Sequence, residues 1–257
     1  MIFKRAVARL RAQDWMAIAV ELAIVVVGVF VGSWVNDWSQ ARAEQRDAKV
    51  LVLRLRPQLQ RLLAIEQGER DYYSITQRFA QTALAGWADD PRVADSDFVI
   101  AAYQASQVAG LSIDGSSLSV ALGADAVHKI DDPALREAVI AVISYNFAAL
   151  RADTLLDDYR KHVREVLPYP VQQRIRQSCG DRQNQDFLIL PGTCTISFAP
   201  GEAASAAALL RSQRELPGQL AFHVAQTNAW LSNLSRLDVR VRSLLALIER
   251  DSRSVGA

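Results

Sequence analysis

The sequence has few of the residues from which catalytic and metal sites are built. It contains two cysteines and three histidines, and His128, His162 and His223 lie far apart, without a spacing typical of metal ligands. No phosphate-binding glycine loop, nucleophile elbow or zinc motif is present. The sequence therefore predicts no catalytic residue, no cofactor and no metal site, and it favours a non-enzymatic protein.

An excess of charge of one sign is also lacking, because the net charge is +1. Without the four basic and two acidic residues of the first 35, 25 basic and 26 acidic residues remain. A phosphate backbone needs a basic surface, so nucleic acid is not an expected partner. The doublets Asp89-Asp90 and Asp131-Asp132 each precede a proline at a predicted helix boundary, and Asp157-Asp158 is expected on a solvated helix face.

One long apolar run is present, at residues 16–35 (MAIAVELAIVVVGVFVGSWV). Twenty helical residues span about 30 Å, the thickness of a hydrocarbon core. Its eleven Ile, Val, Leu and Phe residues favour insertion by roughly 3 to 6 kcal/mol, against at most about 3 kcal/mol for the one charged residue, Glu21. The run predicts a single transmembrane helix in the lipid bilayer.

The flanks of the run indicate its orientation. The tail 1–15 carries four basic residues and one acidic residue, which predicts a cytoplasmic N-terminus and a C-terminal domain outside, in the periplasm of a bacterial inner membrane. Trp15, Trp34 and Trp38 are placed as anchors at the two membrane interfaces. A secretory signal cleaved near Val31-Gly32-Ser33 is the main alternative and leaves the remaining chain outside as well.

A helical seam joins Glu21, Gly28 and Gly32, which project within about 40° of one another on a helix. Small residues let two helices approach closely in lipid, and a protonated Glu21 can hydrogen-bond across such a contact. The seam predicts a possible homodimer through the transmembrane helix. A general abundance of glycine in membrane helices is the other explanation.

The two cysteines, Cys179 and Cys194, enclose a polar loop rich in turn residues. In an oxidising compartment such a pair is expected to form a disulfide, which stabilises a loop of this size by about 3 kcal/mol. Two unrelated buried thiols and a metal pair are the alternatives, and no neighbouring His or third Cys completes a ligand set.

The remaining chain predicts a mainly α fold, in which the transmembrane helix continues into an irregular helical bundle with a small disulfide-tied hairpin. Residues 36–92 form a helical stalk and first bundle helix, which Pro57 is expected to kink or restart, and residues 93–257 form the rest of the domain. A helix is expected over 96–109, capped by Asp95 or Ser96, followed by short turns over 116–122 and a helix from Asp132-Pro133 to about Val166. A non-helical region over 168–201 is expected next, with strands at 187–190 and 195–198. Two further helices are expected over 202–215 and 218–250.

The segment WMAIAVELAIVVVGVFVGSWVNDWSQARAEQR resembles the start of the DUF6090-like family of uncharacterised bacterial single-pass membrane proteins, with Glu21, Gly28, Gly32, Asn36 and Trp38 at matching positions. Ser39 and Ser33-Trp34 depart from that pattern, and LSVALGADAVHKIDDPALREAVIAVISY resembles a second element of the family. The resemblance implies a membrane-anchored, mostly helical protein and no particular activity.

The expected function is partner binding or envelope sensing by a membrane-anchored domain, with an unidentified envelope protein as partner. Two alternatives stay open: an accessory subunit of an ion-driven membrane complex that uses Glu21, and an anchored enzyme whose site is assembled from distant residues.

Overall fold

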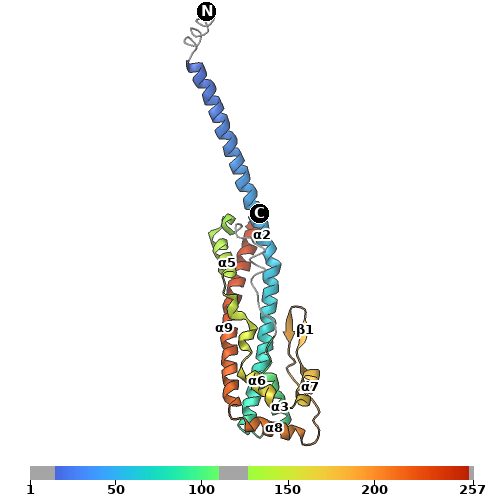
Figure 1. Cartoon of the computed structure of the whole chain (residues 1–257). Helices are drawn as coiled ribbons and strands as arrows, with labels where there is room; N and C mark the ends of the chain where they lie inside the picture. Colours follow the sequence, from blue (N-terminus) through green and yellow to red (C-terminus); the bar gives the residue numbers. More distant parts are fainter. Residues whose placement is uncertain (1–14, 110–126, 255–257) are drawn as a thin grey trace, which may run out of the picture.

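The computed structural model describes residues 15–109 and 127–254 (Figure 1). It is 78% helical, which confirms the mainly α class. Its elements in chain order are α2 (Trp15–Trp87), α3 (Asp95–Ala105), η1 (Val127–Lys129), α5 (Pro133–Ile143), η2 (Phe147–Leu150), η3 (Ala152–Leu155), α6 (Asp158–Val166), α7 (Tyr169–Cys179), β1 (Arg182–Asn184), β2 (Phe187–Ile189), α8 (Glu202–Ser212) and α9 (Leu216–Ser254).

Helix α2 is continuous over 73 residues, about 110 Å. Its first part projects alone from the domain, and its second part runs through the domain beside α9 (Figure 1). The expected restart at Pro57 is wrong, because the helix passes through that residue. Pro57 is exposed, so water can reach the carbonyl of Leu53 that the missing N–H leaves without its helical partner.

Helices α2 and α9 pair as an antiparallel coiled coil. Three side-chain contacts show the register: Arg56–Glu249, Arg70–Ser235 and Gln77–Asn228. From one contact to the next, the residue number rises along α2 by the same amount, seven or fourteen, by which it falls along α9, as antiparallel helices require. Buried positions alternate at spacings of three and four residues, as knobs-into-holes packing requires. They are Val52, Leu55, Leu59, Leu62, Glu66, Glu69, Tyr73, Thr76, Ala80 and Ala83 on α2, and Leu216, Leu220, His223, Thr227, Trp230, Leu234, Leu237, Val241, Leu244 and Ile248 on α9.

Two apolar clusters pack around this pair. The first lies where α2 enters the domain and joins it to α5 and α9, with Val139, Val142 and Leu244 among its buried members. The second lies at the far end, where α3, α6, α7 and α8 cover the end of α2 (Figure 1). The core of the domain therefore consists of two clusters, one toward each end of the α2–α9 pair.

The helix predicted from Asp132-Pro133 to Val166 is interrupted. Asp132 caps α5 by accepting from the backbone N–H of Ala134 at 2.8 Å, as predicted, with Pro133 in the first turn. The helix ends at Ile143, and two 3₁₀ turns, η2 and η3, lead to α6. Asp157 caps α6 through the N–H of Arg160, so a second capping aspartate starts a new helix where one continuous helix was expected.

Other predicted boundaries also change. Helix α3 begins at Asp95 with Ala94 as its N-cap and no side-chain cap bond, so capping by Asp95 or Ser96 is wrong. Pro168 and Pro170 start α7 instead of opening a non-helical region, because proline is tolerated in the first turn of a helix. Likewise α9 begins at Leu216, with Pro217 in its first turn. The turns expected at 116–122 lie outside the described residues.

The hairpin pairs β1 with β2 in antiparallel register, Gln183 opposite Leu188, inside the loop that the two cysteines enclose. The strand predicted at 195–198 is absent from the described structure. Phe187 of β2 lies against Gly68 of α2, where an added β-carbon would clash with the phenyl ring. Gly68 thus leaves the space on α2 that the Phe187 ring occupies.

Gly68→Ala should loosen the hairpin. Overpacking against Phe187 costs about 1–3 kcal/mol and outweighs the gain of about 1 kcal/mol from the better helix former. Hydrogen exchange in β1 and β2 should accelerate. In a Phe187→Ala background the same change should stabilise the chain, and stabilisation by Gly68→Ala in the wild-type background would contradict this packing.

Candidate functional site

The projecting part of α2 presents an apolar surface to its surroundings. Every side chain described between Val20 and Val35 is exposed, Phe30 to 70%. Within the described ranges, α2 is the one helix long and apolar enough to cross a membrane, by length and composition, and none of its most apolar stretch is buried in the protein. Such an exposed surface is unusual for a soluble monomer and marks an interaction site.

The predicted seam lies on this surface. A β-carbon at Gly28 or Gly32 would meet nothing within 4 Å, so the described chain leaves both positions free for a neighbour. The helix includes Glu21, and the side chain of Glu21 lies outside what the structure describes.

The predicted aromatic anchors lie on the same helix. Trp34 and Trp38 are exposed further along α2, and the Arg42 guanidinium lies 4.4 Å from the Trp38 ring centre. Trp15 is the first residue of α2. The seam and the aromatic anchors stay predictions.

Two buried glutamates interrupt the apolar core of the coiled coil. Glu66 and Glu69 are 0% and 1% exposed, and no donor of the described residues lies within hydrogen-bond distance of any of their four carboxyl oxygens. A buried carboxylate without donors is expensive, so its neutral form is favoured. Burial, assisted by the charge of Asp238, raises the pKa of Glu66 to about 8. Burial alone raises the pKa of Glu69 to about 7.

Asp238 of α9 is the partner of Glu66. Its two oxygens accept from Nε and Nη2 of Arg242 at 2.8 and 3.0 Å, and this pairing lowers the pKa of Asp238. Two ionised carboxylates cannot hydrogen-bond to each other, whereas a protonated Glu66 donates to the ionised Asp238. The raised pKa of Glu66 and the lowered pKa of Asp238 together favour the proton on Glu66 and the negative charge on Asp238.

Sequence reasoning missed both glutamates, although a signal existed. Glu66 and Glu69 continue the three-and-four spacing of Leu55, Leu59 and Leu62, which leads on to Tyr73. A reading of apolar residues alone passes from Leu62 to Tyr72 and skips both acids, whereas extending the heptad places them in the core.

A buried histidine–aspartate pair lies nearer the far end of the domain. His223 Nδ1 is 2.7 Å from Asp157 Oδ2, and their side chains are 3% and 9% exposed. The solvated position expected for Asp157 is therefore wrong, because this carboxyl both caps α6 and binds the imidazole. His128 is exposed, and His162 lies between Gln213 and Gln219. The three histidines do not converge.

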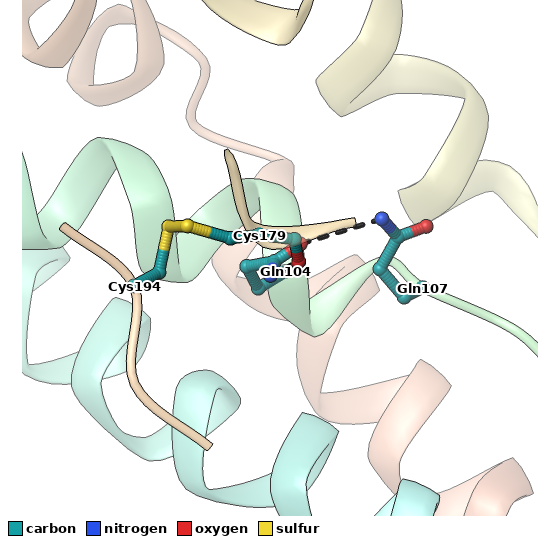
Figure 2. The surroundings of a disulfide bond; sticks show 4 residues. All are labelled: Gln104, Gln107, Cys179 and Cys194. Carbon is teal, nitrogen blue, oxygen red and sulfur yellow. Dashed lines mark hydrogen bonds between the residues drawn. A yellow bond between two sulfur atoms is a disulfide. The ribbon is translucent and has the colours of Figure 1, made fainter. Parts of the chain in front are cut away.

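The predicted disulfide is present between Cys179, the last residue of α7, and Cys194 (Figure 2). The two Cα atoms lie 5.5 Å apart. Gln104 donates through Nε2 to the carbonyl of Cys179 at 2.7 Å, and Gln107 donates to the Oε1 of Gln104 at 3.3 Å. The buried Gln104 amide thereby ties the end of α3 to the end of α7 beside the covalent bond, and Gln107 holds that amide in place.

No group of three or more His, Cys, Asp or Glu side chains within residues 15–109 and 127–254 is arranged to hold a metal ion. Comparison with protein-family models, with curated proteins and with solved structures finds no match to this chain. The resemblance to the DUF6090-like family therefore stays a prediction from its quoted segments.

Asp157→Ala should destabilise the domain by about 2–4 kcal/mol, since it removes a helix cap and leaves the buried imidazole without its partner. Urea unfolding of the full chain in detergent measures the change. The matched control is Asp158→Ala at the exposed neighbouring position, which should cost less than about 1 kcal/mol. Equal costs for the two variants would contradict the role of Asp157.

Proposed function

We propose that this chain is a non-enzymatic single-pass protein of the bacterial inner membrane, whose irregular helical-bundle domain lies in the periplasm and binds an envelope partner or senses a change in the envelope. One observation carries the proposal. The first part of α2 exposes an apolar surface that nothing in the described chain covers, and the same helix continues as a core helix of the folded domain. A lipid bilayer satisfies that surface, because hydrocarbon imposes no penalty on exposed apolar side chains.

The short distance between anchor and domain supports this placement. Glu44 pairs with Lys129 at 3.5 Å, and Gln45 donates to Asp131 at 3.3 Å. These contacts begin about ten residues after Val35, which is roughly 15 Å along a helix. The domain then stands close to the membrane surface with its long axis along α2, in position to meet another membrane protein.

The disulfide supports an oxidising compartment, because such bonds persist outside the cytoplasm and are rare within it. Together with the basic tail, it supports a cytoplasmic N-terminus. These two arguments are independent, since one rests on redox chemistry and the other on the charge of the first fifteen residues.

Two arginines in the apolar surface should abolish anchoring. Val27→Arg with Phe30→Arg costs about 5–7 kcal/mol at the bilayer centre, more than the roughly 3–6 kcal/mol that favours insertion. The variant should leave the membrane on alkaline extraction, and its cysteines should become reactive to a maleimide in intact cells. Val50→Arg with Leu53→Arg, at exposed positions beyond the span of the same helix, should change neither.

Retention of the Val27/Phe30 variant in the membrane with an intact disulfide would refute the anchor. The mass of the mature wild-type protein tests the signal-peptide alternative in the same preparation. A chain beginning after residue 33 would show that the segment is cleaved and is no anchor.

Gly28→Leu with Gly32→Leu should reduce transmembrane dimers at least severalfold, since leucine keeps the two helix backbones apart. A cysteine introduced at Asn36 reports the dimer by disulfide crosslinking in native membranes. Ala23→Leu enlarges a small residue on another face of the helix and should leave crosslinking unchanged. Glu21→Gln should preserve crosslinking, because glutamine can still hydrogen-bond across the seam. Equal crosslinking in all variants would contradict a dimer seam.

A further inference from the structure

We propose that Glu66 and Glu69 form a proton-binding layer in the α2–α9 coiled coil, which holds the two helices together when both carboxyls are protonated and loosens them when the protons leave. The proposal concerns the folded domain and does not depend on the membrane placement. Its ligand is the proton itself.

The register of the coiled coil places both glutamates in its core. The contact Arg70–Ser235 places Glu66 and Glu69 opposite the stretch of α9 that contains Leu234, Leu237 and Val241. Both acids thus occupy core positions between apolar layers, where an ionised carboxylate meets hydrocarbon. A neutral carboxyl fits the same position at far lower cost.

The charged and titratable groups that the described part of the chain brings near Glu66 come from several elements. Asp238 and Arg242 face it from α9, Arg70 lies one turn along α2, and Tyr145 approaches from the segment after α5. Arg242 is already engaged with Asp238 by two hydrogen bonds, and Arg70 donates to Ser235 Oγ at 2.9 Å. Neither arginine is a hydrogen-bond partner of an ionised Glu66 in this arrangement.

Among residues 15–109 and 127–254, no positive charge compensates that of an ionised Glu69. Its charge affects the neighbouring tyrosines Tyr72 and Tyr73 of α2, and Arg160 of α6 acts on those two tyrosines. Burial alone determines the raised pKa of Glu69. Loss of its proton therefore leaves inside the helix pair a carboxylate to which no described residue donates a hydrogen bond.

The sign of the pH effect follows from these positions. In the unfolded chain both glutamates lose their protons near pH 4.5, whereas in the folded chain they keep them until about pH 7 and 8. Their stabilisation is fully present below about pH 4.5 and is lost as the pH rises through these folded values. Within that window each group raises the unfolding equilibrium constant about tenfold per pH unit.

The test is a titration of the full chain in detergent between pH 4 and 9. NMR of ¹³C-labelled glutamate carboxyls, assigned with Glu66→Gln and Glu69→Gln, should give two midpoints well above that of ordinary glutamate. Hydrogen exchange of α9 amides around residues 231–241, corrected for intrinsic rates, should accelerate at least tenfold between pH 6 and 8.5.

The variants separate proton binding from a merely structural role. Glu66→Gln with Glu69→Gln imitates the protonated state, so the double variant should keep α9 protected at pH 8.5 and exceed the wild type in stability there. Glu137→Gln, at an exposed position of α5, is the matched control and should retain the wild-type pH response.

Ordinary glutamate midpoints for both carboxyls would overturn the proposal. So would raised midpoints with exchange in α9 that does not respond to pH. If the double variant does not fold, the wild-type titration and the two single variants still decide between these outcomes.

Discussion

The pairing of α2 with α9 is the interaction on which the rest of the structure depends. Both helices bury a continuous three-and-four spacing of residues, and the elements between them attach to one end or the other of that pair. Helices α3, α6, α7 and α8 cover the far end, and α5 covers the near end (Figure 1). Since α2 is the one described helix that continues beyond the domain, any force or constraint on its projecting part acts directly on this pair.

Polar residues in the coiled-coil core reduce its stability and specify its register. Glu66 and Glu69 are such residues in the part of α2 that pairs with α9, and His223 is one near the start of α9. The three side chains differ in their hydrogen-bond partners. His223 has a buried carboxylate partner on α6, Glu66 shares a hydrogen bond with Asp238 when protonated, and Glu69 has no donor among the described residues. The response of the coiled coil to pH is therefore expected mainly from the two glutamates.

Sequence reasoning succeeded where a local signal was sufficient. The apolar run, the Asp132-Pro133 helix start and the cysteine pair each follow from neighbouring residues, and the structure contains the long helix, the cap and the disulfide. It failed where the partner is distant. Asp157 looks solvated until His223 is placed against it, sixty-six residues away. The hairpin likewise pairs Phe187–Ile189 with Arg182–Asn184, whereas local β propensity favoured residues 195–198 as its second strand, and the contact of Phe187 with the distant Gly68 left no local signal.

The central claim is that one rigid helix joins the projecting apolar surface to the core of the domain. Spin labels on Ser39→Cys and Ser74→Cys, both exposed and on either side of Pro57, measure this directly, since the native cysteines are bonded to each other. Thirty-five helical residues separate the labels by about 52 Å. A narrow distance distribution near that value in detergent-solubilised protein is the expected result. A broad distribution, or one centred at a much shorter distance, would show a hinge at Pro57 and contradict the account.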